Sequence, residues 1–245
     1  VPSLKKIYPY SGYIKWLNTI EKATSLTYWQ SYLSGYENAV SIPRQNTVTG
    51  DAITREKTIS IVGSLRQSIK KFCNEQGITE NTFVQTTWGL LLAKYNNTTD
   101  VVFGSVVSGR PASLEGVEEM IGLFINTVPV RIRVNEATTL RELFSDVQRN
   151  NIASTDHHYI QLADIQAQSI PGRNLFDHIL VFENYPVQPV SQPTATGSRN
   201  DRLAHPQVLS MKVVQKVPYD FRLTVSAAAD INIEFCYNAG LYDDR

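Results

Sequence analysis

The sequence predicts a layered α/β domain in which a mixed sheet is flanked by helices. Three observations lead to this prediction. Strand-like and helix-like segments alternate along the first part of the 245-residue chain. A hairpin pattern follows near the end, where the alternating runs 221–225 and 231–235 flank a short "AAAD" turn. Hydrophobic residues make up 42% of the chain and charged residues 19%, a composition that supports a sizeable core.

The first predicted elements are helical. Residues 10–34 are rich in aromatic and aliphatic side chains, and they predict one or two short helices that end at Gly35. A polar stretch then runs to about Glu56. Residues 57–62 predict a short strand.

Two further helices are predicted next. Ser64 and Gln67 have the spacing of a capping box at the start of the first helix, and Gly77 is expected to end it. Thr79 is expected to cap the second helix. The apolar stripe of that helix is formed by Val84, Trp88, Leu91, Leu92 and Tyr95.

The stretch "MIGLFINTVPVRIRV", residues 120–134, places an amide at the start of an apolar strand. Its second half alternates between aliphatic residues and the outward set Pro129, Arg131 and Arg133, which predicts a half-buried strand. A buried amide without a partner costs about 1–3 kcal/mol, so Asn126 requires either a hydrogen-bond partner or a functional surface. Residues 100–111 predict a neighbouring buried strand that ends in a Gly-Arg-Pro turn.

The remaining elements are a helix, a strand and a hairpin. Thr139 and Glu142 form a second capping box. The inner face of that helix is formed by Leu140, Leu143, Phe144 and Val147. Residues 175–186 predict a strand, and 186–207, rich in Pro, Gln, Thr, Ser and Gly, predict a long loop. A strand at 209–216 is expected to pair with the hairpin.

Composition and charge exclude several classes of protein. Lys plus Arg equals Asp plus Glu at 23 each, so no basic excess favours nucleic acid as a partner. No apolar run approaches the roughly 18 residues that span a bilayer, and no signal peptide is visible. Cys73 and Cys236 are interpreted as unpaired packing thiols of a cytoplasmic protein. The chain begins at Val1, and it is interpreted as a piece of a longer protein.

The sequence contains no self-contained catalytic set. Phosphate-loop and nucleophile-elbow motifs are absent, and no Cys/His spacing suits zinc. The adjacent pair His157 and His158 is interpreted as structural or surface rather than catalytic. His178 lies in the middle of a predicted strand, where it either lines a cavity or is a hydrogen-bonded core histidine, and the second alternative is favoured.

Five stretches of the sequence match short motifs of one known protein family. The stretch "IGLFINTVPVR" is similar to I-G-x-F-V-N-T-x-x-x-R, and this is the most specific match. "YSGYIKWL" resembles Y-x-D-F-A-x-W, with Gly12 in place of Asp, and "YWQSYLSG" resembles Y-W-x-x-x-L-x-G. "HHYIQLADIQ" resembles H-Q-x-x-P-x-x-x-I, with Gln161 in place of Pro, and "GRNLFDHILVFENYP" resembles S-R-N-P-L-F-D. Together these stretches resemble the condensation domains of nonribosomal peptide synthetases.

The resemblance covers the chain from about residue 9 to its end, and it implies the C-terminal half, or acceptor-side lobe, of such a domain. In the family, two chloramphenicol-acetyltransferase-like lobes face each other across a cleft. The family's catalytic H-H-x-x-x-D-G motif belongs to the N-terminal lobe and is not found here, because Tyr159 to Ala163 follow the histidine pair without its Asp and Gly. The resemblance therefore implies no catalytic residue in this chain.

The same resemblance implies where substrates would lie. Asn126 and Ser108, with Arg110 after it, are expected at the substrate cleft, and His178 is included as a candidate that lines it. Residues 186–207 are the candidate for a latch that crosses to the other lobe. Asp243 and Asp244 are expected to begin a closing helix.

The resemblance also implies partners and an activity. The partners are the missing N-terminal lobe, an adjacent adenylation domain, and carrier proteins whose phosphopantetheine arms enter the cleft; no cofactor is bound directly. The complete domain would join a donor thioester to the amine of a carrier-bound acceptor, and this chain alone would be inactive. An epimerisation-type lobe ranks lower, because its W-F-T motif is not present at 123–127. A carrier-binding module without chemistry is the third alternative.

Overall fold

The computed structural model describes residues 8–44, 53–135, 137–183 and 218–242. The predicted loop and candidate latch at 186–207, the predicted strand at 209–216, and Asp243 and Asp244 lie outside these ranges. Within the described ranges, no helix has both the length and the apolar character that crossing a bilayer requires.

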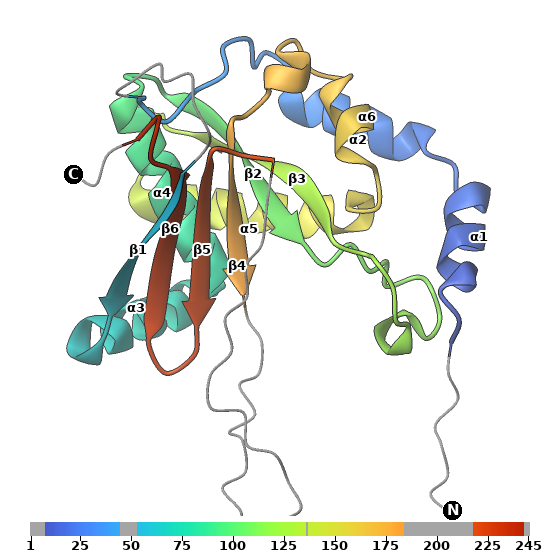
Figure 1. The fold of residues 1–245 in the computed structure, drawn as a ribbon, viewed down its shortest axis with the longest axis horizontal. Coiled ribbons are helices and arrows are strands. Elements are labelled where there is room, and N and C mark those ends of the chain that lie inside the picture. Colours follow the sequence, from blue (N-terminus) through green and yellow to red (C-terminus); the bar gives the residue numbers. More distant parts are fainter. Residues whose placement is uncertain (1–7, 45–52, 136, 184–217, 243–245) are drawn as a thin grey trace, which may run out of the picture.

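A six-stranded mixed sheet forms the centre of the fold, with the strand order β1-β6-β5-β4-β2-β3 (Figure 1). The pairs β2–β3, β5–β6 and β1–β6 are antiparallel, whereas β4 pairs in parallel with both β2 and β5. The strands are β1 (Thr54–Ile61), β2 (Asp100–Val107), β3 (Asn126–Arg133), β4 (His178–Glu183), β5 (Phe221–Ala227) and β6 (Ile231–Asn238). The predicted mixed sheet is confirmed, and Pro129 lies on an edge strand, where its missing N–H is tolerated.

The helices cover both faces of the sheet. Helices α3, α4 and α5 lie on one face, whereas α2 and α6 lie on the other, and α1 lies apart from the sheet (Figure 1). Their bounds are α1 (Ser11–Thr19), α2 (Ala23–Leu33), α3 (Gly63–Gln76), α4 (Glu80–Tyr95), α5 (Leu140–Ser154) and α6 (Leu162–Gln166). Short 3₁₀ turns are η1 (Val117–Glu119), η2 (Thr155–His157) and η3 (Gly172–Asn174).

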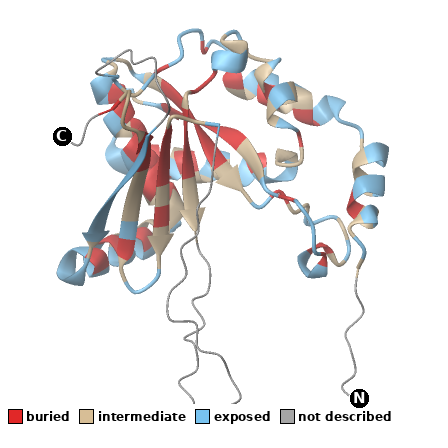
Figure 2. Cartoon of the chain, viewed as in Figure 1, coloured by how far each residue is buried: buried red, intermediate tan, exposed pale blue. Residues whose placement is uncertain are grey.

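Strand β2 is buried on both sides. Successive side chains of a strand point to opposite faces, and Val102 and Phe103, both 0% exposed, belong to different apolar clusters. Phe103 packs in the larger cluster under α4 and α5, and Val102 packs in the cluster under α2 and α6. Figure 2 shows the buried residues concentrated where helices meet the sheet, whereas β1 is exposed along almost its whole length.

Three of the predicted helix boundaries are confirmed, two by N-caps and one by a C-terminal glycine. The Thr79 hydroxyl accepts a hydrogen bond from the Thr82 N–H at 3.1 Å, and Thr139 and Glu142 form both bonds of a capping box. Gly77 ends α3 in the left-handed conformation, with φ at 64°. The predicted cap at Ser64 is wrong, because α3 begins at Gly63 and Ser64 lies in its first turn; the N-cap is Val62, and no side chain caps the helix.

The buried faces of α4 and α5 differ from the predicted stripes. In α4, Leu91 and Tyr95 are exposed, whereas the buried face includes Thr82, Gln85 and Thr86. In α5, Leu140 is also exposed. The predicted stripe assumed that only apolar residues face the sheet, but one side of α4 packs against a polar cluster.

Candidate functional site

The ends of β2 and β3 bring three of the predicted site residues together. Val107 at the end of β2 pairs with Asn126 at the start of β3, so the turn that carries Ser108 and Arg110 lies beside Asn126. Gly109 has a φ of 62°, and a Cβ atom at this position would lie 2.0 Å from the Phe124 carbonyl oxygen. Only glycine fits this contact.

Arg110 fixes the loop that leads into β3. Its Nη1 group donates hydrogen bonds to the carbonyl oxygens of Val117 and Met120, and its guanidinium lies 4.1 Å from the centre of the Phe124 ring. Ser108, in contrast, is exposed. Of these two residues, therefore, Ser108 is the one that is available to a ligand.

The amide of Asn126 is bonded within the chain. Its Nδ2 group donates to the carbonyl oxygens of His158 and Ile160 at 2.8 and 2.6 Å, and its Oδ1 accepts from the Thr127 N–H at 2.9 Å. An amide nitrogen has two protons, so its donor capacity is used completely, whereas the oxygen retains a second lone pair. Asn126 joins β3 to a segment that lies more than thirty residues away in sequence.

Helix α2 holds the same segment from the other side. The Ser25 hydroxyl lies 2.7 Å from Nδ1 of His157 and 2.8 Å from the Tyr159 hydroxyl. The Tyr28 ring stacks on the His157 ring at 4.1 Å between centres, and Nε1 of Trp29 donates to the His157 carbonyl oxygen. Residues 157–160, which we call the histidine segment, are thus fixed between α2 and β3.

A polar cavity of about 240 Å³ lies between the N-terminal half of α4, the C-terminal half of α5 and the ends of β2 and β3. A chain of hydrogen bonds follows its wall. Nε2 of Gln85 donates to Ser105 Oγ at 3.0 Å, and Nδ2 of Asn151 donates to Gln85 Oε1 at 2.7 Å and to Thr82 Oγ1 at 3.1 Å. The Thr82 hydroxyl donates to Gln148 Oε1 at 2.7 Å.

His158 lines this cavity, whereas the ring of His157 packs against Tyr28. Nε2 of His158 lies 3.0 Å from the Ser154 hydroxyl. Burial, and secondarily the neighbouring His157, lowers the pKa of His158 to about 4. The ring is therefore neutral at neutral pH, and it adds no charge to the cavity.

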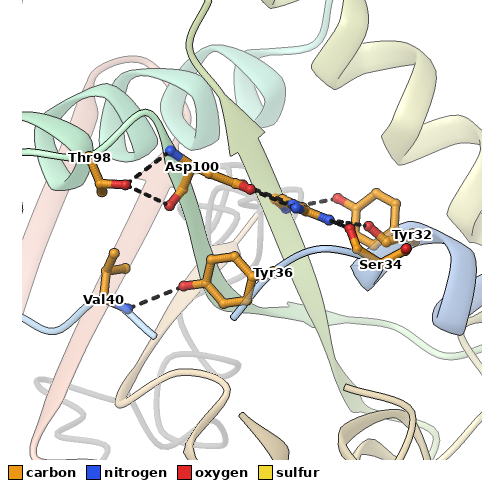
Figure 3. Close-up of polar contacts among 7 residues, drawn as sticks. Tyr32, Ser34, Tyr36, Val40, Thr98 and Asp100 are labelled. Atoms are coloured by element: carbon orange, nitrogen blue, oxygen red, sulfur yellow. Dashed lines mark hydrogen bonds and ion pairs between the residues drawn. The ribbon is translucent and has the colours of Figure 1, made fainter. Parts of the chain in front are cut away.

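Arg131 occupies a second polar site on β3. Its Nε and Nη2 donate to the two carboxylate oxygens of Asp100 at 2.8 and 2.6 Å, and its Nη1 donates to the carbonyl oxygens of Tyr32 and Ser34. Figure 3 shows these partners converging from α2 and from the start of β2. The predicted outward position of Arg131 is wrong, because α2 covers this face of β3 and leaves the residue 6% exposed.

His178 lies in the core and apart from the β2–β3 edge. Its ring is 0% exposed; Nε2 accepts from Trp88 Nε1 at 3.0 Å, and Nδ1 lies 2.8 Å from the carboxylate of Asp177. Of the two alternatives raised by the sequence, this geometry favours the hydrogen-bonded core histidine. Cys73 and Cys236 are free and buried, as predicted.

Sequence reasoning missed the residues that form the polar cavity. A signal was present, because Thr82 and Gln85 are spaced i, i+3 on α4 and Gln148 and Asn151 have the same spacing on α5, which places each pair on one face of its helix. The apolar residues of both helices form the stronger periodic pattern, and the polar pairs are hidden within it. Among the described residues, no group of His, Cys, Asp and Glu side chains is arranged to hold a metal ion.

Comparison with known proteins identifies the family. A family model described as the condensation domain matches residues 1–245. The chain is 38% identical to bacitracin synthase 3 of Bacillus licheniformis and 34% identical to tyrocidine synthase 2 of Brevibacillus parabrevis. The two matches cover 96% and 99% of this chain, which spans only 4% and 7% of the length of those relatives.

Solved structures share the fold at low sequence identity. A four-domain nonribosomal peptide synthetase, holo-AB3403, matches with a TM-score of 0.74 and 18% identity over 94% of this chain and 18% of its own. The first condensation domain of the calcium-dependent antibiotic synthetase matches with a TM-score of 0.69 and 13% identity, over 96% of this chain and 48% of its own. The sheet and helices described above have the chloramphenicol-acetyltransferase-like architecture of these structures. On the family match and the curated relatives, this chain belongs to the condensation domain family of nonribosomal peptide synthetases.

Proposed function

We propose that residues 1–245 act as the C-terminal lobe of a condensation domain. With an N-terminal lobe, this lobe joins a carrier-bound donor acyl or peptidyl thioester to the amine of a carrier-bound aminoacyl acceptor. The nitrogen attacks the thioester carbonyl, the amide bond forms, and the donor thiol leaves with a proton. The lobe contributes mainly by holding the two carrier-borne substrates together.

One observation carries this proposal. Asn126 belongs to the stretch that resembles I-G-x-F-V-N-T, and its amide bonds to the stretch that resembles H-Q-x-x-P-x-x-x-I through the carbonyls of His158 and Ile160. Two motifs of the family, far apart in sequence, thus form one structural unit at the ends of β2 and β3. If both motifs face the substrate from one edge of the lobe, they must lie side by side, and this contact between them supports that arrangement.

Two further facts support the assignment to one lobe. The sequence contains no H-H-x-x-x-D-G motif, and the described residues form a single six-stranded sheet. The chain also covers about half, 48%, of the solved condensation domain to which it is similar. The residues we propose at the cleft are Ser108 and Asn126, with Arg110 in a supporting role because its guanidinium is bonded to backbone carbonyls.

The partners follow from this function. The N-terminal lobe supplies the catalytic histidine motif, carrier proteins supply substrates on phosphopantetheine arms, and an adjacent adenylation domain loads the acceptor carrier. No cofactor needs to bind to this chain directly. Residues 186–207 remain our candidate for a latch between the lobes; they lie outside the described residues.

The test compares the chain alone with a two-lobe domain. Donor and acceptor carrier proteins, loaded with radiolabelled amino acids, are mixed with the 245-residue chain or with the chain fused after the N-terminal lobe of a related condensation domain. We expect dipeptide only from the fused domain. Turnover by the chain alone, above the rate of the carriers without it, would overturn the assignment to a single lobe.

The same assay separates the alternatives. A fused domain that binds both carriers but forms no dipeptide would indicate a carrier-binding module. Inversion of the donor α-carbon without dipeptide would indicate an epimerisation-type lobe. A variant of the fused domain without the N-terminal histidine motif serves as the negative control.

A further inference from the structure

The polar cavity between α4, α5 and the ends of β2 and β3 has a lining that the proposed function does not use. Four carboxamide side chains line it: Asn81, Gln85, Gln148 and Asn151. Among its described lining residues there is no Asp, Glu, Lys or Arg.

The hydrogen bonds of the wall leave defined groups unused. Asn151 uses its Nδ2 toward Thr82 and Gln85, and its Oδ1 accepts no hydrogen bond from the described residues, whereas the unpaired Oδ1 of Asn81 is buried out of a ligand's reach. The Ser105 hydroxyl accepts from Gln85, and its own proton remains available. Gln148 uses its Oε1 toward Thr82, and its Nε2 remains available as a donor. The cavity therefore offers donors and an acceptor together.

The rest of the lining sets the kind of group that fits. Four aliphatic side chains also line the cavity: Val107 from β2, Val128 and Val130 from β3, and Ile152 from α5. A charged ligand would lose its hydration without meeting an opposite charge, which is unfavourable. His158 is neutral at neutral pH and supplies no compensating charge. A volume of about 240 Å³ suits a group smaller than a drug-sized ligand.

We propose that this cavity is a binding site for an uncharged amide that carries a short aliphatic chain. The amide oxygen accepts from Ser105 or Gln148, the amide N–H donates to Oδ1 of Asn151, and the aliphatic chain lies against the aliphatic lining residues. Two sources have this chemistry: the carboxamide of an Asn or Gln side chain, and the secondary amide of a peptide-like chain. The inference does not depend on the condensation reaction.

The experiment is a titration of the 245-residue chain followed by NMR of labelled Val and Ile methyl groups. Propionamide represents the side-chain carboxamide, and N-methylacetamide represents the secondary amide. Propionate and propylammonium have nearly the same shape and carry a charge. We expect saturable shifts at Val107, Val128, Val130 and Ile152 with an amide, and binding at least about tenfold weaker with either ion.

The two amide probes distinguish the sources. Tighter binding of propionamide assigns the site to a side-chain carboxamide, and tighter binding of N-methylacetamide assigns it to a peptide-like chain. No saturable shift with either amide, or equal affinity for propionate, overturns the proposal.

Two matched variants connect the binding to the cavity. Asn151→Leu removes the amide that bonds to Thr82 and Gln85, whereas Asn150→Leu makes the same change at an exposed neighbour on α5. We expect affinity to fall about tenfold in the first variant and to be unchanged in the second. Ser105→Ala is the second cavity variant if Asn151→Leu does not fold, because it deletes only one hydroxyl. Unchanged affinity in a folded cavity variant contradicts the assignment.

Discussion

Strand β3 carries two polar anchors five positions apart, and they are built on different principles. Arg131 is a buried charge that bonds to Asp100 and to two backbone carbonyls of α2 and its C-terminal end. Asn126 is a partly exposed neutral amide that bonds to the backbone of the histidine segment. Both residues fix a distant segment to the same strand. A buried charge is far more costly to leave unpaired than a neutral amide, so the two anchors should differ most in what their loss does to folding.

The largest effect is expected at Arg131. Arg131→Met leaves the Asp100 carboxylate without its partner and frees the carbonyls of Tyr32 and Ser34, so we expect a loss of about 3–5 kcal/mol in the free energy of unfolding. For a domain of this size, that corresponds to a fall of roughly 6–20 °C in melting temperature. Differential scanning calorimetry measures both.

The exposed Arg133 on the same strand is the matched control. Arg133→Met should change stability by less than about 0.5 kcal/mol. The double variant Arg131→Met/Asp100→Leu should recover part of the loss, because no charge is then left unpaired. A single variant at Arg131 as stable as the control would show that the buried ion pair contributes nothing net.

The second effect is the release of the histidine segment. Asn126→Ala should lower the free energy of unfolding by about 1–3 kcal/mol and accelerate hydrogen exchange at residues 157–160 more than in β3. Asn126→Asp should be no better than Ala, because a carboxylate oxygen would face the carbonyls of His158 and Ile160. In a two-lobe domain we expect condensation per folded molecule to slow by about tenfold.

Hydrogen exchange decides whether Asn126 acts through that segment. Asn150→Ala, at an exposed position of α5, should change neither exchange nor condensation. If Asn126→Ala slows condensation while exchange at 157–160 is unchanged, the amide contacts substrate rather than positioning the segment.

A third effect is the pH dependence of stability, and it arises in the histidine segment that Asn126 holds. The folded-state pKa of His158 is lowered from 6.5 to about 4. Between these two pH values, the unfolded chain therefore binds more protons at this residue than the folded chain does. Stability from this residue is complete above pH 6.5 and is lost as the pH falls toward 4. At pH 5 we expect a loss of roughly 1–2 kcal/mol relative to pH 7, measured by urea unfolding.

The variant His158→Gln isolates this contribution. Its stability should fall less between pH 7 and pH 5 than that of the unaltered chain, because Gln does not titrate. Equal pH dependence of the two proteins would assign the loss to other groups.

The smallest effect is expected on the α2 side of the histidine segment. Ser25→Ala removes the hydroxyl that lies between His157 and Tyr159, and we expect a loss of about 0.5–1.5 kcal/mol. Ser31→Ala, on the same helix, is the matched control and should have little effect. A loss at Ser25 as large as that at Arg131 would contradict the expectation that a buried charge matters more to stability than a neutral hydroxyl.

The contrast between the anchors also separates what the sequence could predict from what it could not. Thr79, Thr139 and Gly77 act through neighbours three or four residues away, and all three were predicted correctly. The edge position of Pro129 has a similar local reason, namely its missing N–H. A contact between residues that are close in the chain can be predicted from the sequence, because both partners lie within one short stretch.

The predicted burial was wrong for side chains whose surroundings are formed by a segment distant in sequence. Arg131 was predicted to face solvent because strand alternation cannot show that α2 will cover that face. Leu91 and Tyr95 were predicted to be buried, but the side of α4 that packs inward carries Thr82 and Gln85, whose partners come from α5 and β2. The hydrogen-bond partners of Asn126 could not be predicted for the same reason, because they lie at His158 and Ile160, more than thirty residues away in sequence.

The pairing of β1 with β6 has a consequence for biosynthesis. Thr54 pairs with Asn238 and Ile61 with Ile231, so β1 cannot pair with β6 until the end of the chain has been synthesised. At about 5–20 residues per second, a ribosome needs roughly 10–40 s to make the chain between them. During that time β2 and β3 can already form their hairpin, whereas β1 has no neighbour. We expect its charged run Arg55, Glu56 and Lys57, exposed even in the finished fold, to disfavour pairing of this strand with another nascent chain.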